Sequence, residues 1–102
     1  MSKSKSEILD DFQAFMGRFG GKYKEWCVGT TNDPKMELFQ IHGFKQGDKG
    51  LYRHANTELQ AAEVAEFFTH LGAKGDDTVK RGSEFVYAYK MSPHTKPGQS
   101  GK

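Results

Sequence analysis

Segments with helical spacing alternate along this chain with short aromatic runs, and that alternation constrains the fold most. Residues 6–19 repeat apolar side chains every three or four positions, and two glycines follow. An Asn-Asp-Pro sequence opens a second helical segment over residues 32–42. A third, over residues 57–71, begins with Thr57 and Gln60, a capping-box pair. The chain is therefore predicted to contain three helices.

Three short runs between and after these helices have the composition of strands. They cover residues 23–28, 51–55 and 84–90, and the last run, with Phe, Val and Tyr, shows the pattern most clearly. The connections at 43–50 and 72–83 are polar and contain glycine, as loops do. The order α-β-α-β-α-β predicts an α/β fold in which three helices cover a small three-stranded sheet.

The apolar stripes of the first and third helices predict the core. Helical projection places the charged side chains of the third helix on the face opposite its apolar stripe. The predicted core comprises Ile8, Phe12, Phe15, Met16, Phe19, Ala61, Val64, Ala65, Phe68 and Leu71, and Phe85, Tyr87 and Tyr89 share one face of the last strand.

The 102 residues suffice for one domain, expected over 7–91, with disordered ends at 1–6 and 92–102. No apolar run is long enough to cross a bilayer, and the acidic start is unlike a signal peptide, so no membrane partner is expected. A single cysteine indicates a reducing compartment, and we expect a cytoplasmic protein.

Two clusters of side chains have candidate chemistry. Glu63, Glu66 and His70 combine two carboxylates with an imidazole, a set that can bind a divalent metal, but a solvated helix face would carry the same residues. Cys27 would be a nucleophile beside a histidine, whereas a cysteine between Trp26 and Val28 in a strand is typically a small buried side chain. The sequence therefore predicts no resident cofactor.

Basic residues flank the predicted strands. They form a candidate nucleic-acid-binding rim at one end of the sheet, with tyrosines nearby for stacking. Because acidic residues are interleaved and the net charge is only +2, dispersed solubilising charge is the alternative explanation. The rim residues are Lys22, Lys24, Lys45, Lys49, Lys80 and Arg81.

The stretch from Cys27 to His42, CVGTTNDPKMELFQIH, resembles the second motif region of the GIY-YIG endonuclease superfamily. There a strand ends in Tyr, an apolar residue and Gly, and a helix carrying a catalytic Arg follows. The resemblance extends over about residues 26–90 and implies a GIY-YIG-like scaffold. It also implies metal-dependent cleavage of nucleic acid in relatives that keep the catalytic residues.

This chain departs from that pattern at the catalytic positions. Cys27 stands in place of the motif tyrosine, and Glu37 stands in place of the arginine, where it would repel a phosphate. The first motif has no counterpart upstream, and His42 lies one residue beyond the expected position. We therefore expect a domain without efficient catalysis.

Three functions remain to be distinguished. The first is a non-catalytic GIY-YIG-like domain that binds nucleic acid or a partner that processes it. The second is a nuclease that needs Mg or Mn and uses substitute residues, for which the candidates are Tyr23, His42, Arg53 and Glu66. The third is a protein-interaction module or small homodimer, which would use the first helix or the exposed edge of the C-terminal strand.

Overall fold

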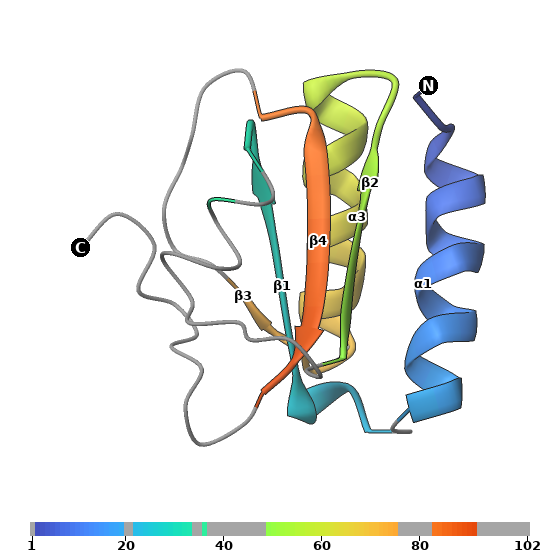
Figure 1. Ribbon diagram of the computed structural model, residues 1–102, viewed down its shortest axis with the longest axis vertical. Coiled ribbons are helices and arrows are strands. Elements are labelled where there is room, and N and C mark those ends of the chain that lie inside the picture. The colour runs from blue at the N-terminus through green and yellow to red at the C-terminus, as the bar shows by residue number, and fades with distance from the viewer. Residues whose placement is uncertain (1, 20–21, 34–35, 37–48, 76–82, 92–102) are drawn as a thin grey trace.

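The helices and strands of the computed structural model alternate much as the sequence indicates, and they form a small α/β domain (Figure 1). The structure describes residues 2–19, 22–33, 36, 49–75 and 83–91. The described elements are helices α1 (Lys5–Phe19) and α3 (Glu58–His70), a 3-10 turn (Tyr23–Glu25), and strands β1 (Trp26–Thr31), β2 (Gly50–His54), β3 (Lys74–Gly75) and β4 (Phe85–Lys90).

The sheet has four strands in the order β2-β4-β1-β3, one more than predicted. β4 pairs antiparallel with both β1 and β2, whereas β3 lies parallel to β1. The additional strand comes from the segment predicted as a loop over 72–83. Gly72 adopts a φ of 115°, which favours glycine, and the chain then runs beside β1 for two residues.

β1 begins three residues later than predicted and extends three residues further. Residues 23–25 form the 3-10 turn, and the Tyr23 ring packs against Phe68, with centroids 6.1 Å apart. Gly29 does not end the strand, because it pairs with Tyr87 of β4. The aromatic composition of 23–28 indicated burial of these side chains, but it did not fix the strand boundary.

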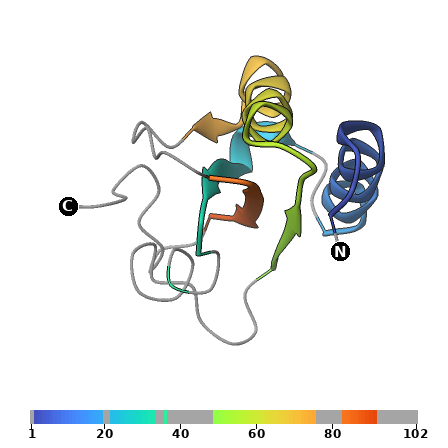
Figure 2. The same cartoon turned by 90° about the horizontal axis from the view of Figure 1, so that it is seen from above.

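Both described helices lie on the same side of the sheet (Figure 2). α3 covers the central strands, and α1 lies beside α3 next to β2. Between the helices and the sheet lies the main core, which includes the predicted residues Ile8, Phe12, Met16, Ala61, Val64 and Phe68. Phe15, Phe19 and Ala65 are partly buried against it, whereas Leu71, predicted in the core, is 45% exposed.

The other face of the sheet carries a second buried cluster. Tyr87 and Tyr89 of β4 and Cys27 of β1 are fully buried there, and Tyr52 packs against them. The ring of Phe85 also meets Tyr52, with centroids 6.1 Å apart. The prediction that the aromatic side chains of the last strand share one face is therefore confirmed.

The N-cap of α3 is confirmed, but the capping box is only half formed. The Thr57 hydroxyl accepts a hydrogen bond from the Gln60 backbone N–H at 3.1 Å. The Gln60 side chain instead accepts from the backbone N–H of Lys5, at 3.2 Å, and so connects the starts of α3 and α1.

The N-terminal residues contact the body of the domain, which differs from the disorder expected for residues 1–6. Lys3 forms a parallel bridge with Ala55, and its backbone N–H donates to the carbonyl of His54 at 2.7 Å. α1 begins directly after this bridge, at Lys5. The tail predicted over 92–102 lies outside the described residues.

Two other predictions are affected by the described structure. Asp33 accepts a hydrogen bond from the Met36 backbone N–H at 3.1 Å, as a helix cap does, while nearly all of the helix expected to follow lies outside the described residues. β4 is paired on both sides, so the predicted exposed edge of the C-terminal strand is wrong. The strands at the two edges are β2 and β3.

Candidate nucleic-acid interface

Several elements begin or end at the same end of the sheet. Trp26, the first residue of β1, pairs with Lys90, the last residue of β4. β2 and β3 also begin at this end, and both α1 and α3 finish there (Figure 1). Basic residues that are far apart in the sequence are therefore brought together.

Six Lys and Arg side chains gather at this end of the domain. They are Arg18, Lys22, Lys24, Lys49, Lys74 and Lys90, and we call them the basic end. All except the half-buried Lys90 are exposed. Within the described part of the chain, the acidic residue at this end is Glu25, whose carboxylate lies 3.6 Å from the Lys90 ammonium. The basic end therefore carries a clear excess of positive charge.

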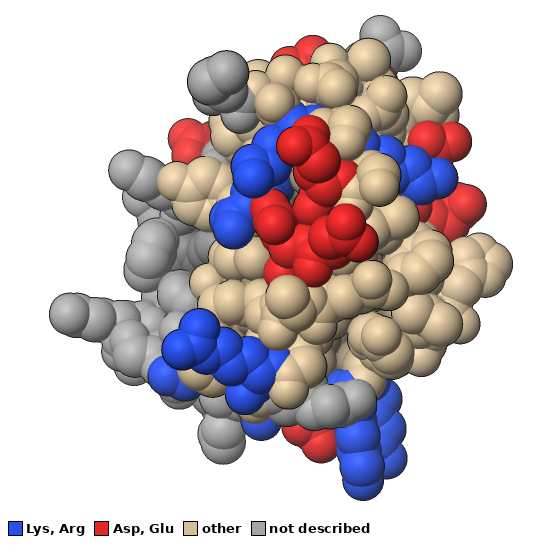
Figure 3. All heavy atoms as spheres, turned by 90° about the vertical axis from the view of Figure 1, so that its right-hand side faces the viewer, with Lys and Arg blue, Asp and Glu red and all other residues tan. Residues whose placement is uncertain are grey.

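The opposite sign predominates over the rest of the described chain. Acidic side chains gather in the upper half of the face shown in Figure 3, flanked there by a few basic ones, whereas Lys and Arg project at its lower edge. The acidic residues away from the basic end are Glu7, Asp10, Asp11, Asp33, Glu58, Glu63, Glu66 and Glu84. Over the described residues, positive and negative charge are therefore separated along the molecule.

Phe19 connects three of the basic side chains. The Lys49 ammonium lies 4.9 Å from the centre of its ring, and the Arg18 guanidinium carbon lies 5.5 Å from it. The Lys90 ammonium donates to the Phe19 carbonyl oxygen at 3.0 Å. These contacts hold the cations around a partly buried aromatic ring and limit their freedom before any ligand arrives.

The structure places three residues of the predicted rim, Lys22, Lys24 and Lys49, together at this end. The other three, Lys45, Lys80 and Arg81, lie outside the described residues. Sequence reasoning missed Arg18, Lys74 and Lys90, because their grouping depends on strand order and on where α1 ends. Lys90 is the last residue of the strand predicted over 84–90, and this position was the signal available for it.

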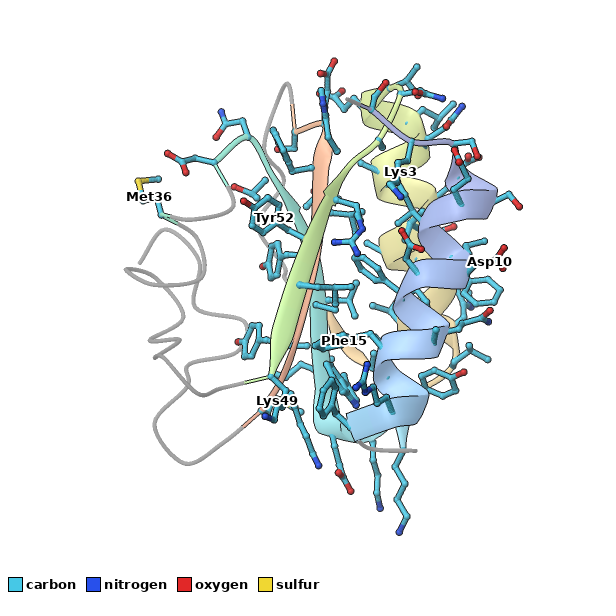
Figure 4. All side chains as sticks on the ribbon, turned by 45° about the vertical axis from the view of Figure 1, so that its right-hand side comes forward. Lys3, Asp10, Phe15, Met36, Lys49 and Tyr52 are labelled. Atoms are coloured by element: carbon cyan, nitrogen blue, oxygen red, sulfur yellow. The ribbon has the colours of Figure 1, made fainter. Side chains whose placement is uncertain are left out.

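A second polar cluster lies between α1 and β2, and Lys3, one of its members, is at the end of β2 away from the basic end. Asp11 Oδ2 accepts from Arg53 Nε at 3.0 Å and from Lys3 Nζ at 3.2 Å. The hydrogen bond from Arg53 is the main reason why the pKa of Asp11 lies below its usual 3.8, and Lys3 lowers it further. This cluster borders a hollow of about 260 Å³ lined by Asp11, Ala14, Phe15, Arg18, Leu51 and Arg53. Figure 4 shows Phe15 between α1 and β2.

Asp11→Asn is expected to lower the free energy of unfolding by about 1 kcal/mol at neutral pH, because two partly exposed charge pairs lose their anion. Because the pKa of Asp11 is lower in the folded state, the carboxylate contributes fully to the free energy of unfolding above the unfolded-state pKa of 3.8. This contribution is lost as the pH falls through the lower pKa of the folded state. The difference between wild type and variant should therefore shrink as pH falls below 3.8 and vanish once Asp11 is protonated in the folded state as well. Urea unfolding at several pH values measures it.

The neighbouring Asp10 provides the control for this prediction. Asp10 is exposed on the same helix. Asp10→Asn also removes one negative charge, but at a position that does not pair with Arg53. It should change the stability by no more than a few tenths of a kcal/mol. Equal losses in the two variants would contradict the assigned role of Asp11.

A third feature is a hollow of about 390 Å³ along the outer side of α3. Its lining comprises Lys5, Glu63, Glu66, Phe67, His70 and Leu71. The predicted metal candidates Glu63, Glu66 and His70 therefore share one surface, and the Lys5 ammonium lies 3.8 Å from the Glu63 carboxylate. Over the described ranges, no three His, Cys, Asp or Glu side chains are grouped so that they could hold a metal ion.

The catalytic candidates occupy different parts of the domain. Arg53 is engaged by Asp11 beside α1, whereas Glu66 lines the hollow along α3. Tyr23 packs against Phe68 in the turn before β1. His42 and Glu37 lie outside the described residues. The described candidates thus line separate surfaces.

Cys27 forms no disulfide and has no exposed surface, and it lies in the cluster with Tyr87 and Tyr89. Its burial matches the structural interpretation of this residue, because a nucleophile has to reach its substrate. His54 is the last residue of β2, at the end of the strand away from the basic end. Its ring stacks on Phe85, and its Nε2 lies 3.1 Å from the Glu84 carboxylate.

The fold and this charged end define the class: a small α/β domain with a mixed four-stranded sheet and a basic end. No family model, curated protein or solved structure matches the chain. Neither of the two described helices is long and apolar enough to cross a membrane.

Proposed function

We propose that this domain binds nucleic acid through its basic end and does not cleave it. The observation that supports the proposal is the gathering of six cations from five separate parts of the chain, with Glu25 as the acidic residue among them in the described structure. Binding of this kind depends on the release of counterions from the phosphate backbone. An end that is basic, exposed and partly held in place around Phe19 suits that purpose.

The absence of cleavage in this proposal rests on two observations. Glu37 occupies the position where the resembled family has its arginine, and the described catalytic candidates Tyr23, Arg53 and Glu66 line separate surfaces. For the family, we propose a GIY-YIG-like scaffold that has no working catalytic centre. The competing hypothesis is metal-dependent cleavage by substitute residues, and the experiment described next distinguishes the two.

The test is incubation of the purified chain with labelled single- and double-stranded DNA and RNA, with Mg, with Mn and with chelator. We expect a mobility shift whose log affinity falls with log salt, with a slope of about −2 to −4.5 if three to five phosphates are contacted. The labelled strands should remain intact under every condition. Cleavage abolished by chelator would favour the nuclease hypothesis, and no shift at low salt would favour a protein partner or a homodimer.

A further inference from the structure

The hollow between α1 and β2 has a composition that a phosphate site would not have. Its walls are apolar, formed by Ala14, Phe15 and Leu51, and one end is polar. The polar end contains both a carboxylate, Asp11, and a guanidinium, Arg53. A bare phosphate would meet repulsion from Asp11, whereas a flat ring with donors and acceptors along its edge would match both groups.

The two ends of this hollow have different chemistry. Asp11 and Arg18 lie seven residues apart on α1, which is about 10 Å along a helix. Arg18 belongs both to the hollow and to the basic end, where Lys49 shares the Phe19 ring with it. A ligand with an aromatic ring at one end and a phosphate at the other would therefore find a complementary group at each end.

The polar end retains hydrogen-bonding capacity for a ligand. Arg53 Nε donates to Asp11 and Nη1 donates to the Tyr52 carbonyl at 2.8 Å. Within the described structure, Nη2 of Arg53 has no hydrogen-bond partner, and both recorded bonds to the Asp11 carboxylate are to Oδ2. An unused donor thus lies close to an available acceptor, the pairing that the edge of a nucleobase presents.

From these features we infer that the hollow between α1 and β2 receives one unpaired base of a single-stranded nucleic acid while its phosphates lie on the basic end. Its volume of about 260 Å³ is just under the range of about 300–1,000 Å³ typical of drug-sized ligands, which suits one ring system. Phe15, in Figure 4, supplies the aromatic wall. The inference rests on the proposed function and adds a preference for single strands, because a base stacked in a duplex cannot enter.

The test compares three probes in chelator: a short DNA single strand, the matching duplex, and an abasic strand of equal length that keeps the phosphates. The single strand should bind about tenfold tighter than the abasic strand, which is the effect of one base against an aromatic side chain. Ala14→Leu fills the hollow from an exposed helix position and should abolish that tenfold difference. Ala62→Leu, the same change at an exposed position of α3 outside both hollows, should preserve it.

A direct measurement shows where the base binds and whether the variant is folded. Nucleoside monophosphates added to isotope-labelled protein should shift the amide resonances of Ala14 and Phe15, with no such shift from inorganic phosphate. The Ala14→Leu spectrum reports its fold in the same experiment.

The outcomes separate this inference from the proposed function. If single and abasic strands bind equally and Ala14→Leu behaves as wild type, the base site is overturned while binding at the basic end stands. If no probe binds at low salt and the monophosphates cause no shift, both are overturned.

Discussion

Phe12→Ala is expected to lower the free energy of unfolding by about 3–5 kcal/mol, the largest single loss that we predict for this domain. Phe12 has no exposed surface and stacks on Phe68 of α3, with ring centroids 5.7 Å apart. Truncation would leave a cavity between α1 and α3, because Phe12 lies in the main core between them. Because domains of this size are stable by about 5–15 kcal/mol, the loss is a large part of the total.

Urea unfolding followed by fluorescence measures this loss. Trp26 is the single tryptophan of the chain and is fully buried against Phe15, with centroids 5.8 Å apart, so its emission reports the opening of the core. Phe67→Ala is the matched control, because Phe67 is 37% exposed on the outer side of α3. It should cost about 1 kcal/mol or less.

The alternative role for α1, a docking element rather than part of the core, makes the opposite prediction. A chain that starts at Gly20 would then remain folded and monomeric, and Phe12→Ala would cost no more than Phe67→Ala. We expect neither, since the apolar face of α1 supplies Ile8, Phe12 and Met16 to the main core.

Local patterns predicted the two described helices, α1 and α3, well because their signals are contained within each segment. The apolar spacing over 6–19 and the Thr57 cap both describe contacts between residues a few positions apart. β3 lacks such a signal. Lys74 and Gly75 form a strand only because the turn at Gly72 places them beside β1, and two residues cannot show a strand pattern.

The same distinction explains which site residues were predicted. Lys22 and Lys24 lie at the start of the strand predicted over 23–28, and Lys49 shortly precedes the strand predicted over 51–55, so a rim at one end of the sheet could be expected from the sequence. Arg18 and Lys74 join that rim only through the finished topology. The pairing of Arg53 with Asp11 spans 42 residues of sequence, and the hollow beside it depends on how α1 lies against β2.

Neutralising two cations of the basic end is expected to weaken nucleic-acid binding more than any other surface change. In the double variant Lys22→Gln and Lys49→Gln, each glutamine keeps a polar side chain but removes a charge that would displace a counterion. We expect the affinity to fall by about 30-fold at low salt and the steepness of the log–log salt dependence to decrease by about 1.5. Fluorescence anisotropy with a labelled single strand across a salt series measures both quantities.

A charge-matched variant separates local contacts from net charge. Asn32→Asp with Asn56→Asp lowers the net charge by the same two units, by adding two carboxylates at exposed positions near the opposite end of the sheet. Beyond a Debye length of about 10 Å at 0.1 M salt, such changes are largely screened, so at this salt concentration the variant should bind with nearly wild-type affinity. Its slope should be unchanged because no cation that contacts phosphate is lost. Equal weakening in the two double variants would mean that overall charge, and not the basic end, determines binding. A lower affinity with an unchanged slope for the lysine variant would mean that Lys22 and Lys49 do not contact phosphate, and the interface would then have to lie elsewhere on the domain.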